Sequence, residues 1–203
     1  MIKVIAGLLK PREGKITFKG EVISGLRADQ VLQRGLSYVP SDRSLFPDMT
    51  VKENLRMGGY ILRDGRLVNR RIDELFTMFP ILKEKSSQMA RTLSGGQQQL
   101  ASIARALVLK PEMIMLDEPS LGLSPKVAQQ IFSTITDLRK NGMTILLVEQ
   151  NARKGLQNAD VGVVLDLGTN SFERPASEVL SDPRIQELYL GKRRKPLATE
   201  NQE

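Results

Sequence analysis

Residues 113–118 read Met-Ile-Met-Leu-Asp-Glu, a bare apolar run that ends in two acidic residues. A second apolar run, Thr-Ile-Leu-Leu-Val, occupies residues 144–148. Between the two runs, apolar residues recur at helical spacing, at Val127, Ile131, Ile135 and Leu138. Two apolar runs separated by an amphipathic helix are typical of buried parallel strands in a βαβ unit. The sequence therefore predicts an α/β fold built on a parallel sheet.

The residues before this unit divide into a β-rich part and a helical part. Residues 15–19 alternate polar and apolar side chains between two glycines, which predicts a short half-exposed strand with a turn at each end. After a proline-punctuated loop at 40–47, residues 51–93 read mainly as helices. A further strand is expected over residues 161–165. We expect the helical part to bury Leu55, Leu75, Phe76, Phe79 and Leu82.

Three places carry helix-start signals. Residues 124–125 and 182–183, Ser-Pro and Asp-Pro, each place a capping side chain before a proline at the first helical position. Ser94 is followed three residues later by Gln97, which is the spacing of a capping box. We therefore expect a helix to begin immediately after Ser94.

The segment Ser94–Gln97 contains two glycines, Gly95 and Gly96, at this helix start. Glycines leave the backbone amides bare, and the helix dipole adds positive potential there. The Ser94 side chain and the two glycine amides are thus suited to hold a phosphate oxygen. Helix initiation alone is the alternative interpretation of the same residues.

Two adjacent carboxylates, Asp117 and Glu118, follow the apolar run at the expected carboxyl end of a parallel strand. Open α/β sheets bind their ligands at that edge. There Asp117 would hold a magnesium ion through its water, and Glu118 would polarise an attacking water. An ordinary acidic loop after a buried strand is the alternative.

The composition excludes several classes of protein. The 203 residues contain neither Cys nor His, which rules out Cys/His zinc sites, thiol nucleophiles, disulfides and Ser-His-Asp triads. The formal net charge is +7, but Lys-Arg-Arg-Lys at 192–195 concentrates part of it near the C-terminus, so no nucleic-acid partner is expected. No apolar run approaches the roughly 20 residues of a membrane-spanning helix, so we expect a cytoplasmic or peripheral membrane protein.

Taken in order and spacing, a series of short motifs resembles the ATP-binding subunits of ABC transporters. The motifs are Leu-Ser-Gly-Gly-Gln at 93–97, Ile-Ala-Arg-Ala-Leu at 103–107, Pro111, Leu-Asp-Glu-Pro-Ser at 116–120 and Leu-Gly-Leu at 121–123. Further strings are similar to an ATPase subunit of branched-chain amino-acid importers, at 46–55, 120–125, 148–152, 181–183 and 189–191. The resemblance covers almost the whole chain.

The resemblance implies a P-loop NTPase-like ABC ATPase core with a parallel sheet, a small antiparallel β part and a helical insert over about residues 51–93. Residues 1–190 would form a single ATPase domain that lacks its N-terminal phosphate loop, and residues 191–203 would form a basic, disordered tail. The implied cofactors are ATP and Mg²⁺, and the implied reaction is ATP hydrolysis. The implied location is the cytoplasmic face of the plasma membrane, where the protein would be peripheral.

The same resemblance implies a role for each candidate site residue. ATP held by a partner subunit would contact Ser94, Gly95, Gly96 and Gln97. Asp117 would hold the metal, and Glu118 would be the catalytic base. Gln150 stands where most of the family has a histidine, and it would contact the γ-phosphate without carrying a charge.

Two regions depart from the family pattern. The phosphate loop has the form G-x-x-x-x-G-K-[ST], and neither 14–15 nor 191–192, both Gly-Lys, fits it, so we expect a start downstream of that loop. The glutamine-loop position reads Pro-Ser-Asp-Arg at 40–43. The short hydroxyl of Ser41 therefore stands where the family has a long Gln or Glu at the nucleotide, and Asp42 is the alternative one position later.

The resemblance also implies partners: a second ATPase subunit in a head-to-tail pair, and transmembrane permease subunits. The loop 43–49 and the helical insert would meet a permease through Leu45, Phe46 and Met57, with plain core packing as the alternative. Two other classes of function remain open, namely a soluble ABC protein acting on ribosomes or DNA and a non-hydrolytic subunit that only completes a partner's site. Branched-chain amino acids are the expected cargo, and urea or short amides are the alternative.

Overall fold

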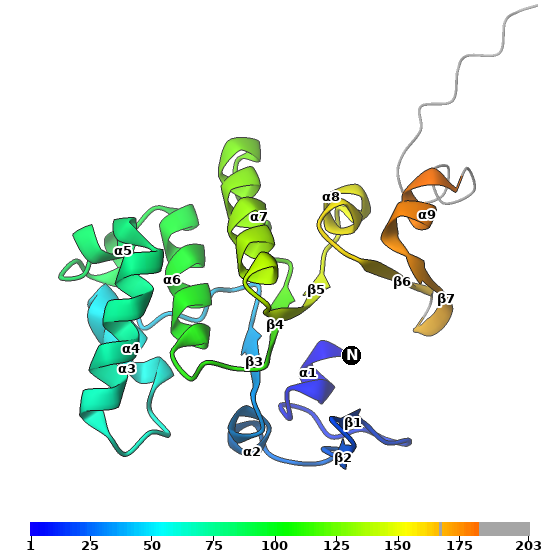
Figure 1. Ribbon diagram of the computed structural model, residues 1–203, viewed down its shortest axis with the longest axis horizontal. Coiled ribbons are helices and arrows are strands. Elements are labelled where there is room, and N and C mark those ends of the chain that lie inside the picture. The colour runs from blue at the N-terminus through cyan, green and yellow to red at the C-terminus, as the bar shows by residue number, and fades with distance from the viewer. Residues whose placement is uncertain (167, 183–203) are drawn as a thin grey trace, which may run out of the picture. The chain divides into compact units, whose positions relative to one another are not determined.

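The computed structural model describes residues 1–166 and 168–182, and the chain divides into two compact units, Met1–Val148 and Glu149–Glu203. The first unit contains a parallel sheet with helices on both faces and a helical insert (Figure 1). The described part of the second unit contains an antiparallel strand pair and two short helices. The predicted extent of a single domain, residues 1–190, stays a prediction, and the predicted tail at 191–203 lies outside the described residues.

The sheet of the first unit consists of parallel strands in the order β3-β4-β5. Their bounds are Leu36–Val39 for β3, Met113–Asp117 for β4 and Thr144–Val148 for β5. The register pairs Leu36 with Met113 and Asp117 with Val148. Helix α7 (Pro125–Lys140) connects β4 to β5. The two apolar runs are therefore neighbouring parallel strands, and the predicted βαβ unit is confirmed.

The two faces of the sheet belong to separate hydrophobic cores, because successive side chains of a strand point to opposite faces. Leu36 and Met115 lie in one core, to which α1 (Ile2–Ile5) and α2 (Ala28–Gln33) contribute buried side chains. Ile114 and Leu116 lie in the other core, together with α6 (Gly95–Leu107) and α7. Figure 1 shows α1 and α7 on opposite sides of the sheet.

The β-rich N-terminal part is a small hairpin of β1 (Thr17–Phe18) and β2 (Glu21–Val22). The strand is shorter than the predicted 15–19. Lys19 and Gly20, between the strands, have φ angles of 51° and 83°. Positive φ at both central residues is the requirement of a type I′ hairpin turn, and glycine meets it without a Cβ penalty.

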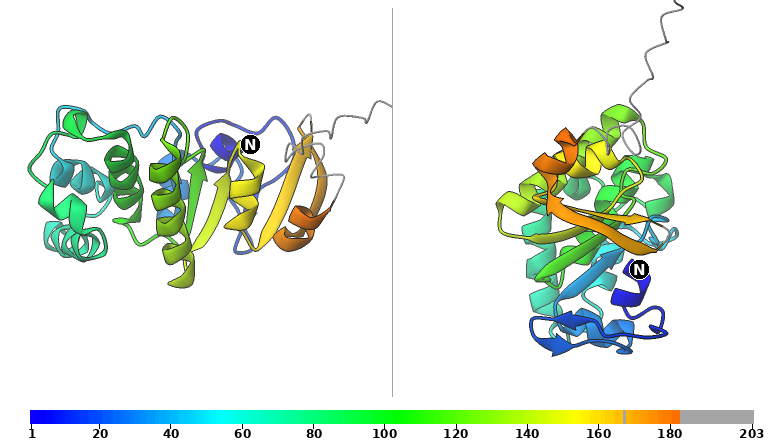
Figure 2. Two further views of the ribbon diagram at one scale, coloured as in Figure 1. Left: turned by 90° about the horizontal axis from the view of Figure 1, so that it is seen from above. Right: turned by 90° about the vertical axis from the view of Figure 1, so that its right-hand side faces the viewer.

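The helical insert contains α3 (Val51–Gly58), α4 (Gly65–Met78), α5 (Pro80–Glu84) and the 3₁₀ turn η1 (Ala90–Thr92). All five predicted core residues of this part, Leu55, Leu75, Phe76, Phe79 and Leu82, are buried. The fully buried side chain of Asn54 accepts from the Phe46 amide at 2.8 Å and donates to the Phe46 carbonyl at 3.0 Å. These bonds attach the preceding loop to the insert, which Figure 2 shows from two further directions.

Helices α3 and α6 are in backbone contact at Gly58. A Cβ added to Gly58 would lie 2.1 Å from the carbonyl oxygen of Arg105 and 2.9 Å from its Cγ. No side chain fits at such a distance without a backbone shift. Glycine at position 58 therefore permits the insert to pack directly on α6.

In the second unit, β6 (Val161–Asp166) pairs antiparallel with β7 (Thr169–Pro175). The predicted strand at 161–165 is confirmed, whereas β7 was not predicted. The helices are α8 (Ala152–Gln157) and α9 (Ala176–Ser181). Asp182, expected to start a helix with Pro183, follows the last residue of α9, and the predicted helix itself lies outside the described residues. Within the described residues, no helix has the length and apolar character that a membrane crossing requires.

Candidate functional site

The carboxyl ends of β3 and β4 bring two of the predicted segments to one edge of the sheet. β3 ends at Val39 and leads into the loop at 40–47, whereas β4 ends at Asp117 and is followed by Glu118. Because the strands are parallel and Val39 pairs with Leu116, the loop and the two carboxylates leave the sheet side by side. This is the edge at which α/β sheets bind ligands.

Asp117 accepts a hydrogen bond from a neighbouring strand. The Tyr38 hydroxyl donates to Oδ2 of Asp117 at 2.9 Å, and both residues are half-buried. Burial raises the pKa of Tyr38, and the hydrogen bond to Asp117 together with the charges of Asp117 and Asp42 raises it further. Tyr38 therefore stays protonated at neutral pH and fixes one oxygen of the Asp117 carboxylate.

Glu118 has an unusual backbone conformation immediately after β4. Its φ of 47° lies in the left-handed region, which is uncommon for a residue with a Cβ. Its amide donates to the Val148 carbonyl at 2.8 Å, and its carbonyl accepts from the Leu121 amide at 3.0 Å. These bonds hold the chain in a sharp turn at the end of the buried strand, and backbone strain of this kind concentrates at functional sites.

The predicted capping box at the start of α6 is confirmed. The Ser94 amide donates to Oε1 of Gln97 at 3.0 Å, and the Gln97 amide donates to Oγ of Ser94 at 3.4 Å. Gly95 and Gly96 are the first two helical residues, whose amides have no partner inside a helix. A Cβ on Gly96 would lie 2.3 Å from Cγ1 of Val127, so this glycine also permits close packing against the first turn of α7. The phosphate contact of these residues stays a prediction.

The loop after β3 lies against α6. Arg43 and Ser44 have φ angles of 65° and 41°, again in the left-handed region. Oγ of Ser102 donates to the Arg43 carbonyl at 2.7 Å, and a guanidinium nitrogen of Arg105 donates to the Ser44 carbonyl at 2.7 Å. Two side chains of one helix therefore hold two consecutive loop residues in an uncommon conformation.

Ser41 and Asp42, the two candidates at the glutamine-loop position, lie in this loop. Ser41 is half-buried, and Asp42 is exposed and accepts a hydrogen bond from the Ser44 hydroxyl. The charge of Asp42 acts on Tyr38, whose pKa it helps to raise. The structure thus places both candidates at the same edge as Asp117, and their contact with a nucleotide stays a prediction.

Gln150 belongs to the second unit. It is exposed, and its carbonyl accepts from the Ala152 amide at 3.0 Å, just before α8 begins. Its contact with a γ-phosphate stays a prediction.

Two residues near the site were not among the sequence candidates. Tyr38 is missed because the sequence around it is that of an ordinary strand. Its spacing of two residues from Leu36 could have placed both side chains on the same face of the sheet. Arg43 is missed because a single cation in a proline-bounded loop is unremarkable. Its guanidinium donates to the Leu121 carbonyl at 3.3 Å, which joins the loop after β3 to the loop after β4.

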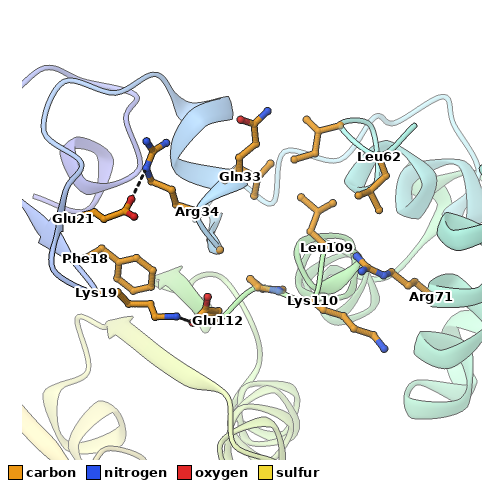
Figure 3. Close-up of a pocket in the computed structure, with 14 residues that line it drawn as sticks. Phe18, Lys19, Glu21, Gln33, Arg34, Leu62, Arg71, Leu109, Lys110 and Glu112 are labelled. Carbon is orange, nitrogen blue, oxygen red and sulfur yellow. Dashed lines mark hydrogen bonds and ion pairs between the residues drawn. The ribbon is translucent and has the colours of Figure 1, made fainter. Parts of the chain in front are cut away.

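A cavity of 680 Å³ lies away from these residues, at the amino ends of β3 and β4, and is lined by Gly35 among others. Figure 3 shows two ion pairs among its charged side chains, Lys19 with Glu112 at 2.6 Å and Arg34 with Glu21 at 3.3 Å; Arg71 and Lys110 also line the cavity. Its position at the opposite end of the strands separates this cavity from Asp117 and its neighbours.

A smaller hollow of 250 Å³ lies between the loop after β3, α3 and α6. Phe46 and Met57 line it, with 41% and 37% of their surface exposed. The Arg105 guanidinium lies 5.8 Å from the centroid of the Phe46 ring. Leu45, the other apolar candidate, packs half-buried against the core. Core packing therefore describes Leu45, and an exposed apolar surface remains at Phe46 and Met57.

Comparisons with known proteins agree with this geometry. Residues 1–121 match the family model described as ABC transporter. The chain is 40% identical over 192 residues to the high-affinity branched-chain amino acid transport ATP-binding protein BraG of Pseudomonas aeruginosa, covering 94% of this chain and 82% of that protein. It is 37% identical to the probable branched-chain amino acid transport ATP-binding protein LivF of Archaeoglobus fulgidus, covering 94% and 81%. A nucleotide-free ATP-binding cassette from an ABC transporter superposes with a TM-score of 0.78 at 29% identity, covering 94% of this chain and 82% of that chain.

Proposed function

The chain belongs to the ABC transporter family of ATP-binding proteins, and from that membership we propose that it is an ATP-binding and ATP-hydrolysing subunit of an importer of branched-chain amino acids. Two similar proteins carry names that refer to branched-chain amino acid transport, which supports this cargo. The observation that carries the ATPase role is the position of Asp117 and Glu118 beside the loop 40–47, at the carboxyl edge of the sheet.

Magnesium is the metal that suits Asp117. Mg²⁺ prefers oxygen ligands, takes few of them from the protein and is completed by phosphates and water. The ion would supply charge neutralisation at the phosphates. The Tyr38 hydroxyl donates a hydrogen bond to one oxygen of the Asp117 carboxylate and so orients it.

Glu118 is the residue that we assign as the general base. Its carboxylate would accept the proton of the water that attacks the γ-phosphate. The sequence contains no histidine, so the carboxylate next to the metal-binding position is the natural acceptor. Gln150 would contact the γ-phosphate through its amide.

The segment Ser94–Gln97 would act on a second nucleotide, held by a partner ATPase subunit in a head-to-tail dimer. The Ser94 hydroxyl and the amides of Gly95 and Gly96 would meet its γ-phosphate at the positive end of α6. Ser41 would lie at the nucleotide bound on its own side. Closure of the pair on ATP is then the event that moves the rest of the transporter.

The hollow lined by Phe46 and Met57 would receive a transmembrane permease subunit. Exposed apolar residues around a concave surface are the usual features of a protein-protein contact. This contact would hold the subunit peripherally at the cytoplasmic face of the plasma membrane.

Reconstitution of the assembled transporter in liposomes tests the function. With its permease and binding-protein subunits, ATP hydrolysis should rise when leucine, isoleucine or valine is added and should stay at the basal rate with urea or acetamide. Stimulation of ATP hydrolysis by urea or acetamide, without stimulation by the amino acids, would show that the cargo is a short amide. Absence of ATP hydrolysis under any of these conditions would contradict the ATPase role.

A second candidate function uses Ser94–Gln97 alone. The segment starts α6 with a capping box and two glycines, and it could complete a nucleotide site on a partner subunit without hydrolysis by this chain. Glu118→Gln in this subunit alone separates the two: it lowers hydrolysis by the complex if this Glu118 is a base and leaves it unchanged if the partner's residues do all the hydrolysis.

A further inference from the structure

We propose that Arg43 is a further phosphate-binding residue, whose guanidinium meets the same anion as Ser94 and the amides of Gly95 and Gly96. The inference rests on the proposed function in one respect only, namely that the anion is the end of an ATP molecule held by the partner subunit. The site itself is built from residues of this chain.

The position of the guanidinium is the first support. Both terminal nitrogens of Arg43 lie 3.6 Å from the point that a Cβ on Gly95 would occupy, and one of them lies 3.9 Å from the corresponding point on Gly122. The guanidinium is therefore packed against the first residue of α6, where two helix amides lack intrahelical partners. A cation beside bare amides at the positive end of a helix creates a strong preference for an anion.

The unused donors of Arg43 are the second support. A guanidinium carries five N–H donors. Within the described residues, Arg43 uses one of them in a 3.3 Å bond to the Leu121 carbonyl, forms no ion pair, and has its Nε buried without a hydrogen-bond partner. The buried Nε is out of reach of solvent and therefore of an anion, so the donors that Arg43 offers to a phosphate are those of its terminal nitrogens, whose bond to Leu121 is exposed.

The charges around the guanidinium are the third support. The side chains nearest to positions 95 and 96 besides Arg43 are those of Leu123 and Val127, which are neutral. Asp42 precedes Arg43; its carboxylate accepts from the Ser44 hydroxyl, and its charge acts on Tyr38 and Arg105. Arg43 is the charged side chain nearest to Gly95, and a phosphate is the class of ligand that fits a cation at this helix start.

The backbone explains how this position is maintained. Arg43 has a φ of 65°, its amide donates to the Pro40 carbonyl at 3.2 Å, and its carbonyl accepts from Oγ of Ser102 at 2.7 Å. The loop conformation is therefore fixed from α6 itself. Lys and Gln also carry a Cβ and experience the same backbone strain at this φ as Arg. Substitution of Arg43 by either residue therefore changes the polar end of the side chain and leaves the backbone strain unchanged.

Inorganic triphosphate is the probe, added to the full 203-residue chain at constant ionic strength while the amide resonances of Gly95 and Gly96 are followed by NMR. We expect both resonances to shift with triphosphate. Arg43→Gln should raise the dissociation constant about tenfold, which is the loss of about one charge-assisted hydrogen bond. Arg43→Lys should stay within about threefold of the wild type, because a cation remains. Arg66→Gln removes the same charge from an exposed position on α4 and should change nothing.

An Arg43→Gln chain that binds triphosphate like the wild type would overturn the inference, as would wild-type shifts that avoid residues 94–97. An equal loss of triphosphate affinity in Arg66→Gln would show that only the net charge of the chain matters, and this result would also overturn the inference. The rest of each spectrum reports whether the variant is folded. Triphosphate binding is measured without hydrolysis. The Arg43 proposal can therefore fail while the reconstituted transporter still hydrolyses ATP, and it can hold when the transporter does not hydrolyse ATP.

Discussion

The hydroxyl of Tyr38 donates a 2.9 Å hydrogen bond to Oδ2 of Asp117, between residues 79 positions apart in the sequence. This bond joins β3 to the acidic end of β4 across the sheet. It fixes the orientation of the carboxylate that we assign to magnesium. Two of the predictions below test it directly.

Tyr38→Phe removes the hydroxyl and keeps the ring. We expect the free energy of unfolding, measured in urea at pH 7, to fall by about 1 to 2 kcal/mol, because a hydrogen bond to a charged acceptor is lost. In the reconstituted transporter, half-maximal hydrolysis should require several times more Mg²⁺. Tyr60→Phe is the matched control for the unfolding measurement, since Tyr60 is 79% exposed and should tolerate the change. An unchanged Mg²⁺ requirement would show that the bond is only structural.

The pH dependence of stability follows from the raised pKa of Tyr38. The folded-state pKa lies above the unfolded value of about 10, so the folded chain retains this proton where the unfolded chain has lost it. The contribution of Tyr38 is therefore complete below pH 10 or so and is lost as pH rises toward the folded-state pKa. The wild type should keep its stability advantage over Tyr38→Phe at pH 9 and lose it progressively as the pH rises above about 10, and a constant difference from pH 9 to pH 12 would contradict the assignment.

Glu118→Gln keeps the size of the side chain but removes the proton acceptor. ATP hydrolysis by the reconstituted complex should fall by at least about 100-fold, a typical contribution of a general base. ATP binding should survive, so that the closed dimer accumulates on addition of ATP. Asp117→Asn should instead weaken the Mg²⁺-dependent binding of ATP. Near-normal turnover in Glu118→Gln would show that Glu118 is not the general base and that Asp42 or the substrate itself accepts the proton.

Glu118→Gly provides a matched control for the backbone at the same position. Gly adopts a φ of 47° without the Cβ penalty, so we expect this variant to be no less stable than Glu118→Gln on thermal unfolding. It should be equally inactive. Loss of folding in Glu118→Gly alone would show that the side chain has a packing role that the base assignment does not include.

Gly95→Asp adds a carboxylate at the start of α6. The nearest side-chain atom to the new Cβ would be Cδ2 of Leu123 at 3.4 Å, so the fold should accept it. The carboxylate would repel the γ-phosphate and would also pair with the guanidinium of Arg43. We expect ATP-dependent dimerisation, followed by light scattering, to be abolished in the complex of ATPase subunits. Gly95→Ala is the control and should still dimerise. If Gly95→Asp also dimerises, Ser94–Gln97 has no role beyond capping α6.

Met57→Ala tests the docking hollow. Met57 is 37% exposed beside Phe46, and its truncation should weaken co-purification of the subunit with its permease several-fold. Met78→Ala is the matched control, because Met78 is 52% exposed on α4 and does not line the hollow. Basal ATP binding should be the same in both. Equal loss in the two variants would move the permease contact elsewhere.

Periodicity alone accounts for much of the fold. The apolar runs that became β4 and β5, and the helical spacing that became α7, are local signals that need no knowledge of the partner strand. The capping box of Ser94 and Gln97 is equally local. The strand β7, in contrast, is polar and ends in Pro175, so nothing in its composition distinguishes it from a loop until β6 is placed beside it.

The site was less predictable than the fold because its contacts span long distances in the sequence. Asp117, Glu118 and Ser94 could be found from short motifs. Tyr38 and Arg43 could not, since their roles depend on strand register and on a left-handed loop conformation that α6 imposes from outside. Local residue types carry no record of either.

The contact at Gly58 has a mechanical consequence. Because the α3 backbone rests on the Arg105 carbonyl with no side chain between them, the two helices have no layer in which to slide. Met57 lies one residue before Gly58, and α6 begins directly after Ser94. The hollow that we propose for the permease and the helix start that we propose for the phosphate therefore belong to two helices in direct backbone contact, and we expect a displacement of one to move the other.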